Sequence, residues 1–192
     1  IATTLKARVA LVEAGDMGGD CLNTGCVPSK ALLARAGVAQ RARDASGFGV
    51  STGPVSVDFE AVMSQVEAAI ATIAPNDSVE RYTALGVDVI KGWAQLPSPF
   101  EVQVNDQTFS SRSIIMASGA SPIVPDVAGA ITVPVLTSDS IWSLQALPKR
   151  LLVVGGGAIG CEMAQAFQRL GSQVVLVEAM SRLVAREEPE VS

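Results

Sequence analysis

The spacing of hydrophobic positions changes along the first half of the chain. A short apolar run from Arg8 to Glu13 predicts a buried strand, and helix-favouring residues follow from Ala31 to Ala45. Apolar positions at helical spacing predict a second, amphipathic helix that begins at a capping Asp58 and runs to about Leu85. Pro75 is expected to kink or interrupt this helix because proline has no backbone N–H to donate.

Alternating apolar positions then replace the helical spacing. Short strands are predicted at Val87 to Ile90, Phe100 to Val104 and Thr108 to Phe109, with a hairpin turn at Asn105-Asp106. Ile114 to Ala117 is predicted to form one more buried strand. We therefore expect a small antiparallel β-meander in this part of the chain.

A β–α–β unit is predicted at the end of the chain. Prolines punctuate residues 122–148, which makes this segment the best candidate for a domain boundary. A strand at Leu151 to Val154, a helix to about Leu170 and a strand at Val174 to Val177 follow. The pattern of a strand ending in glutamate occurs twice, as VALVEA and VVLVEA. The sequence thus predicts an α/β protein with two related nucleotide-binding domains, at residues 1–135 and 136–192.

The second domain carries a G-x-G-x-x-G motif at Gly155, Gly157 and Gly160, directly after the predicted strand. In that position the first glycine permits a tight turn, the second lets the backbone approach a pyrophosphate, and the third lets helix and strand pack closely. Ala158 and Ile159 begin the helix, whose unpaired N–H groups attract phosphate. An ordinary glycine-rich turn is the alternative interpretation.

An acidic residue ends the strand that follows this motif. Glu178 is placed to accept hydrogen bonds from the adenosine ribose, and its charge would repel a 2′-phosphate. NAD is therefore predicted in preference to NADP, a preference that Arg182 and Arg186 nearby make moderate. Glu13 ends the earlier VALVEA strand, and it is either an equivalent acid or a simple strand terminus.

Two cysteines lie in a predicted loop from Gly15 to Lys30. Cys21 and Cys26 are close in sequence, and Pro28 places Cys26 at or just before the start of a helix. There the helix dipole and the charge of Lys30 favour thiolate over thiol, which suits thiol–disulfide exchange. Two ordinary cysteines are the alternative. The third cysteine, Cys161, is expected to be a small buried hydrophobic residue in the helix after the glycines.

Composition excludes several classes of function. The net charge is −5 and aromatic residues make up 4% of the chain, which disfavours nucleic-acid binding. With three cysteines and no histidine, a closed zinc site is not expected. No apolar run is long enough for a membrane span and no secretory signal is visible, so we expect a cytoplasmic protein.

Three segments resemble the class I pyridine-nucleotide disulfide oxidoreductases, a family that contains dihydrolipoamide dehydrogenase, glutathione reductase and mercuric reductase. GGDCLNTGCVPSK is similar to the active-site signature of that family. ASGASP at Ala117 to Pro122 resembles its A-T-G-x-x-P element beside FAD, with Ser118 in place of threonine. The stretch from Leu136 to Glu162 resembles the beginning of its NAD domain. Mercuric reductase-like and dihydrolipoamide dehydrogenase-like members are the most similar subgroups.

The resemblance implies a role for each matching residue. Cys21 corresponds to the thiol that exchanges with substrate and Cys26 to the thiol beside the flavin. Lys30 corresponds to the lysine next to the flavin N5, and Glu162 to the acid that pairs with it. The implied FAD contacts are Glu13, Gly19, Ser29, Lys30, Ser118 and Gly119. The implied NAD contacts are Gly155, Gly157, Ala158, Ile159, Gly160 and Glu178.

The implied activity is electron transfer from NAD(P)H through FAD to the cysteine pair, and from there to a small-molecule disulfide, a lipoyl group or a metal ion. A homodimer is expected for the whole protein, with the FAD glycine loop before Ile1 and a dimerisation domain after Ser192. The isolated chain is expected to hold FAD weakly and to lack full turnover. Three alternatives stay open: a catalytically incompetent nucleotide-binding fragment, a thiol protein that handles metal, and an NADH oxidase or peroxidase.

Overall fold

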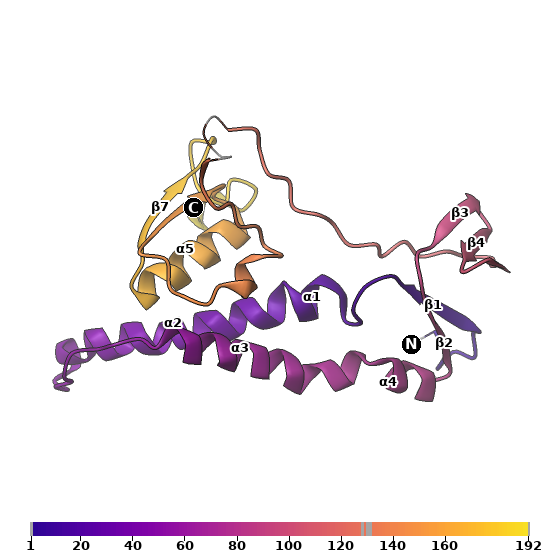
Figure 1. The fold of residues 1–192 in the computed structure, drawn as a ribbon, viewed down its shortest axis with the longest axis horizontal. Helices are drawn as coiled ribbons and strands as arrows, with labels where there is room; N and C mark the ends of the chain where they lie inside the picture. Colours follow the sequence, from indigo (N-terminus) through magenta and orange to yellow (C-terminus); the bar gives the residue numbers. More distant parts are fainter. Residues whose placement is uncertain (1, 128, 130–131, 192) are drawn as a thin grey trace. The chain divides into compact units, whose positions relative to one another are not determined.

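The computed structural model describes residues 2–127, 129 and 132–191. By their internal contacts the residues divide into two compact units, Ile1–Asn23 with Ile70–Ser121 and Thr24–Ala69 with Pro122–Ser192 (Figure 1). Each unit is built from segments that are distant in sequence. The predicted division into domains at residues 1–135 and 136–192 is a separate question and stays a prediction.

The first unit contains a parallel pair of strands, β1 (Val9–Glu13) and β2 (Val87–Lys91). Their register aligns Glu13 with Lys91, and the N–H of Gly92 extends the ladder by donating to the carbonyl of Glu13 at 2.9 Å. The short helices α1 (Gly19–Asn23) and α4 (Val79–Ala84) belong to the same unit, and α4 contacts β2.

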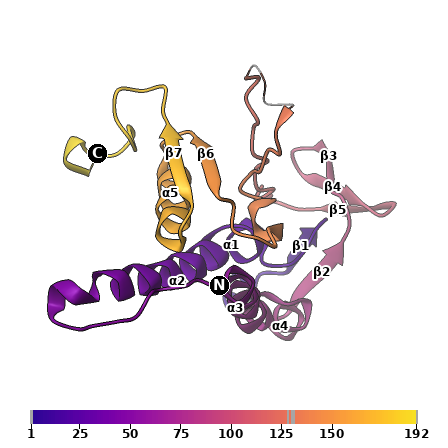
Figure 2. The same ribbon diagram turned by 60° about the vertical axis from the view of Figure 1, so that its left-hand side comes forward.

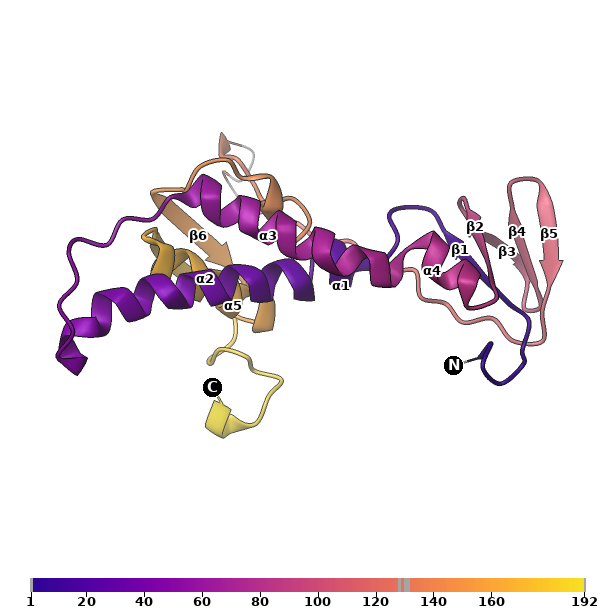
Figure 3. The ribbon, with the colours of Figure 1, turned by 90° about the horizontal axis from the view of Figure 1, so that it is seen from below.

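An antiparallel meander completes this unit, as the alternating pattern predicts. Its strands are β3 (Gln95–Ser98), β4 (Glu101–Val104) and β5 (Gln107–Ser110) (Figure 3). Asn105 and Asp106 both adopt positive φ, 49° and 61°, which is the requirement of a type I′ hairpin turn. The sequence pattern did not identify β3, which contains a proline.

The strand predicted at Ile114 to Ala117 is wrong. This segment has no regular secondary structure, and Ile115 is 90% exposed. A strand forms only where a neighbour takes up its backbone hydrogen bonds, and among the described residues β1 pairs with β2 alone. An apolar run therefore did not suffice to make this segment a strand.

Two long helices pack along each other: α2 (Cys26–Asp44), which a 3₁₀ turn (Ala45–Phe48) extends, and α3 (Phe59–Ile73), which belongs to the second unit as far as Ala69 (Figure 3). Asp58 caps α3 as predicted, because its Oδ1 accepts a hydrogen bond from the N–H of Ala61 at 3.0 Å. The helix ends before Pro75, where a 3₁₀ turn (Ala74–Asp77) interrupts the helical pattern that α4 resumes.

The β–α–β unit has the predicted order: β6 (Arg150–Val154), α5 (Ala158–Leu170) and β7 (Gln173–Val177). The two strands are parallel, and α5 lies along them (Figure 2). Short 3₁₀ turns precede it at Ile141–Ser143 and follow it at Pro189–Val191. Helices α2, α3 and α5 share one buried core, which is formed by Ala31, Leu32, Ala36, Phe59, Met63, Val66, Ile141, Met163, Ala166, Phe167 and Leu170.

The predicted loop from Gly15 to Lys30 is mostly helical, so that prediction is also corrected. It contains α1 and the first turn of α2. Glycines and polar residues suggested a loop, whereas the buried Leu22 and Pro28 anchor the two helical segments. Cys26 is the first residue of α2, as the position of Pro28 predicted.

Candidate functional site

The glycine loop between β6 and α5 has the geometry that its motif predicts. Gly155 has φ +106°, a backbone conformation that favours glycine. A Cβ on Gly160 would lie 2.0 Å from the carbonyl oxygen of Gly155, so helix and loop approach too closely for any side chain. A Cβ on Gly157 would meet nothing within 4 Å. The first turn of α5 therefore faces open space, with Ala158 and Ile159 exposed beside it.

Glu178 is held directly under this loop. Its Oε2 accepts a hydrogen bond from the N–H of Gly156 at 2.6 Å, and its Oε1 accepts one from the N–H of Met180 at 2.8 Å. These backbone donors, Met180 first, lower the pKa of Glu178 below its usual value. The carboxylate is thus ionised and fixed, and each oxygen keeps a lone pair for a ribose hydroxyl.

Gly156 is a site residue that the motif does not name. A Cβ there would lie 2.5 Å from Leu183 Cδ2 and 3.1 Å from Glu178 Oε2. Its carbonyl accepts hydrogen bonds from the N–H of Val184 at 2.7 Å and from Cys161 Sγ at 3.4 Å. Cys161 is therefore half-buried and bound to the loop backbone, which refines the prediction of a buried hydrophobic residue. In the sequence, the only sign of a role for Gly156 was that Gly155 and Gly156 stand directly before Gly157.

Arg182 is turned toward its own segment. Its Nη2 donates to the carbonyls of Ala185 at 3.0 Å and Glu187 at 2.9 Å. Its Nη1 is buried and has no hydrogen-bond partner among the described residues. The guanidinium is thus engaged with the segment after β7, and the preference for NAD over NADP stays a prediction.

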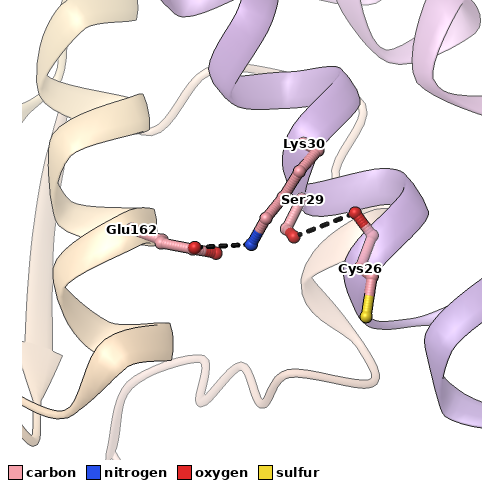
Figure 4. Close-up of polar contacts among 4 residues, drawn as sticks. All are labelled: Cys26, Ser29, Lys30 and Glu162. Carbon is pink, nitrogen blue, oxygen red and sulfur yellow. Dashed lines mark hydrogen bonds and ion pairs between the residues drawn. The ribbon is translucent and has the colours of Figure 1, made fainter.

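A second group of candidate residues lies where α2 meets α5 (Figure 4). Lys30 Nζ and Glu162 Oε1 form an ion pair at 2.5 Å across 132 residues of sequence. The Lys30 side chain is 62% exposed, and exposed ion pairs contribute little to stability. The ion pair therefore adds little to the shared core in holding the two helices together. Ser29 is buried, and its hydroxyl donates to the carbonyl of Cys26 at 3.3 Å.

The first unit holds the remaining candidates. Glu13 Oε1 accepts a hydrogen bond from the N–H of Gly15 at 2.7 Å. Glu178 Oε1 accepts in the same way from the N–H of Met180, which also lies two residues later in the chain. Gly19 has φ +58° at the start of α1, the helix that carries the exposed Cys21. A Cβ on Gly119 would lie 3.0 Å from Asp20 Oδ2, so the ASGASP segment lies beside α1.

Gly18 is a further residue that the sequence did not single out. It has φ +93°, and a Cβ there would lie 2.3 Å from Leu22 Cδ2. Its place in the cysteine signature was the only signal. The candidate residues divide between the two units: Glu13, Gly19, Cys21, Ser118 and Gly119 lie in the first, and Cys26, Ser29, Lys30, Glu162, Gly155, Gly157, Ala158, Ile159, Gly160 and Glu178 in the second.

Metal ligands and membrane spans were also sought among the described residues. No group of three or more His, Cys, Asp or Glu side chains there is arranged to hold a metal ion. None of the helices in residues 2–127, 129 and 132–191 combines the length and the apolar character that crossing a bilayer requires.

A parallel β–α–β unit whose helix starts at a glycine loop, and whose second strand ends in a fixed carboxylate, is the dinucleotide-binding part of a Rossmann-like fold. An exposed cysteine begins α2, where the sequence predicts thiol–disulfide chemistry. The sequence profile described as pyridine nucleotide-disulphide oxidoreductase matches residues 1–192. The chain belongs to this family, whose cofactors are FAD and NAD(P)H.

Individual relatives agree with that assignment. Over 186 residues the chain is 34% identical to a mercuric reductase of Lysinibacillus sphaericus, covering 97% of this chain and 34% of the relative. A dihydrolipoyl dehydrogenase of Chlamydia trachomatis is 34% identical over 191 residues, covering 96% and 41%. The flavoprotein disulfide reductase RclA from Escherichia coli has the same fold, with a TM-score of 0.79 and 28% identity over 98% of this chain and 40% of that one.

The chain thus spans between about a third and two fifths of the length of these relatives. The family and the fold class that the sequence predicted are confirmed, together with the antiparallel meander. The roles of the individual site residues stay predictions.

Proposed function

We propose that the whole protein is an FAD-dependent oxidoreductase that passes electrons from NADH, by way of FAD, to Cys21 and Cys26. The ion pair between Lys30 and Glu162 carries this proposal. It places a side chain of the helix that begins with Cys26 against a side chain of the helix that begins at the glycine loop. Under this proposal, thiol chemistry and dinucleotide binding belong to one catalytic site.

The residues of this chain fit both cofactors. For NAD, the support is the close approach of Gly160 to Gly155 and the fixed carboxylate of Glu178. For FAD, the support is the carboxylate of Glu13, which accepts from a backbone N–H as Glu178 does, and the positive charge of Lys30. That positive charge would interact favourably with a negatively polarised flavin. Bound FAD would supply the redox chemistry by which two electrons from a hydride donor reach a pair of thiols.

The cysteines would complete the reaction by two exchanges. The Cys21 thiolate attacks a substrate disulfide, forms a mixed disulfide and releases the first substrate thiol. The Cys26 thiolate then attacks Cys21 Sγ and releases the second thiol, which leaves a Cys21–Cys26 disulfide. The dithiol loses two electrons and the substrate disulfide gains them. Reduction by NADH, through FAD, restores the dithiol.

The final electron acceptor is proposed as a small-molecule disulfide, a lipoyl group or a metal ion. Two observations favour a metal ion: mercuric reductases are among the relatives, and a Cu(II) complex of RclA is among the structural neighbours. We also propose the FAD-binding domain at residues 1–135, the NAD-binding domain from residue 136, a homodimer and a cytoplasmic location. A reducing compartment suits a dithiol of this kind.

An anaerobic titration of the full-length protein with NADH, followed by visible absorbance, tests the proposal. After two electrons we expect a long-wavelength band, because the thiolate of Cys26 would then lie against oxidised flavin. Bleaching of the flavin without that band would remove the cysteines from the electron path. Absence of flavin would favour the alternative of a catalytically incompetent nucleotide-binding protein.

Nucleotide selectivity gives a second test. Glu178→Ala removes the carboxylate that accepts from the ribose and repels a 2′-phosphate, so NADH affinity should fall about tenfold while NADPH affinity changes less. Dissociation constants for both nucleotides, measured by NADH fluorescence, check this. Replacing Glu188, an exposed acid outside the loop, with alanine is the matched control. Equal losses for NADH and NADPH would contradict the proposed role.

A further inference from the structure

Trp142 contacts the cysteine signature from far along the sequence. Its indole Nε1–H donates to the carbonyl of Thr24 at 2.9 Å and to the carbonyl of Ser138 at 2.8 Å. Trp142 and Thr24 are 118 residues apart and belong to the same unit. Because tryptophan has a single N–H, the bond is shared between both carbonyls. None of the roles assigned above involves this residue.

The turn that carries Trp142 is fixed by its own hydrogen bonds. Ser140 Oγ accepts from the N–H of Thr137 at 2.9 Å, and the carbonyl of Thr137 accepts from the N–H of Ile141 at 3.0 Å. Ile141 is buried in the core shared by α2, α3 and α5, and the Trp142 ring packs against that core. The indole donor therefore holds a defined position.

Thr24 is the residue that leads into the helix of Cys26. Its carbonyl belongs to the peptide bond with Gly25, the N-cap of α2, and Cys26 follows as the first helical residue. The carbonyl of Gly25 accepts from the N–H of Ser29 at 3.0 Å, which closes the first turn. Holding Thr24 thus fixes how the chain enters the turn that displays the thiol.

The other half of the spacer between the two cysteines is held as well. Asn23 Nδ2 donates to the carbonyls of Met17 at 3.1 Å and Gly19 at 3.0 Å, within the first unit. Two adjacent residues of the spacer are therefore held by hydrogen bonds, Asn23 through its side chain and Thr24 through its carbonyl. These bonds restrict the movement of the spacer.

We propose that Trp142 is a positioning residue for Cys26, and that its hydrogen bond to Thr24 keeps the exposed thiol at the first position of α2. The proposal rests on the proposed function for its meaning in catalysis, since it concerns the reactivity of the thiol that would face the flavin. A phenylalanine at this position keeps an aromatic ring but has no N–H to donate, and it is smaller than the indole.

The test compares full-length wild-type protein with Trp142→Phe by two measurements. The first is the rate at which iodoacetamide alkylates Cys26 at pH 7 in reduced protein, read by tandem mass spectrometry. The second is the fraction of Cys21–Cys26 disulfide at equilibrium with graded glutathione buffers. Loss of one hydrogen bond predicts alkylation slower by about three- to tenfold. It also predicts that the equilibrium between dithiol and disulfide shifts by a similar factor, about 30 mV for tenfold.

Controls separate positioning from folding. Trp93→Phe alters the exposed tryptophan of the other unit and should leave both measurements unchanged. In the Trp93→Phe protein, Trp142 is then replaced with β-(3-benzothienyl)alanine, which keeps the bicyclic ring but has sulfur in place of the N–H. This analogue should reproduce the effect of Trp142→Phe. Unchanged rate and equilibrium in this analogue would overturn the proposal. So would an effect of Trp142→Phe that the analogue does not share, because ring packing would then explain it.

Neither measurement requires flavin or NADH, so the two proposals fail separately. If the long-wavelength band is absent but the analogue still slows alkylation of Cys26, the positioning role stands and the electron path is wrong. If the band is present and the analogue changes nothing, the electron path stands and the positioning role is wrong.

Discussion

Replacing Cys26 with serine should reduce NADH-dependent disulfide reduction by at least about 10³-fold, to the background of the assay. Serine has a similar shape but cannot form a disulfide, so electrons would have no route from flavin to substrate. Because Cys26 is exposed at the start of α2, the substitution of serine changes the structure only locally, and the fold should persist. Steady-state reduction of the disulfide substrate by the full-length protein measures the loss.

Two controls make this result specific. Cys161→Ser changes the third thiol, which is half-buried and bonded to the carbonyl of Gly156, and it should retain most of the activity. NADH-linked reduction of an artificial dye by Cys26→Ser should continue, because that reaction takes electrons from the flavin without the thiols. Retained disulfide reduction in Cys26→Ser would end the proposal that Cys26 carries the electrons.

Replacing Gly160 with alanine is expected to damage both folding and nucleotide binding. The new methyl group would lie 2.0 Å from the carbonyl oxygen of Gly155, and backbone cannot move aside as a flexible side chain does. Overpacking of this severity costs about 3 kcal/mol, which corresponds to about a hundredfold in NADH affinity if the loop absorbs the strain. Thermal unfolding and NADH titration of the same preparation separate the two losses.

Gly157→Ala is the matched variant for this experiment. A Cβ at Gly157 meets no atom within 4 Å, so the unfolding temperature should stay near that of the wild type. Its NADH affinity should still fall, because the methyl group would occupy the space that a pyrophosphate approaches. Equal stability of Gly160→Ala and Gly157→Ala would show that helix α5 does not depend on close contact with the glycine loop.

Local patterns in the sequence determined the elements that depend on neighbouring residues. Asp58 and Pro75 set the start and the interruption of the α3 helical segment, and Asn105-Asp106 set the hairpin turn. Pro28 placed Cys26 at a helix start. These features follow from backbone hydrogen bonding and allowed dihedral angles within a few residues, so the amino acids present suffice to predict them.

The β–α–β unit was predictable for the same reason. Its glycine motif, the periods of its helix and strands, and the glutamate after β7 all lie within one continuous stretch of sequence. Resemblance to a family then supplied what no local pattern contains, the pairing of Lys30 with Glu162. The structure places these two side chains in contact because α2 and α5 share a core.

Only the tertiary structure decided the features that depend on distant partners. Ile114 to Ala117 had a strand-like sequence but no strand to pair with among the described residues. Arg182 faces its own segment, and Trp142 reaches Thr24 across 118 residues, because packing of the core decides which donors and acceptors meet. By itself, the sequence determined where the thiols and the glycine loop stand along the chain. The fold decided which side chains hold them, since those contacts are made by packing between helices and loops that no local pattern encodes.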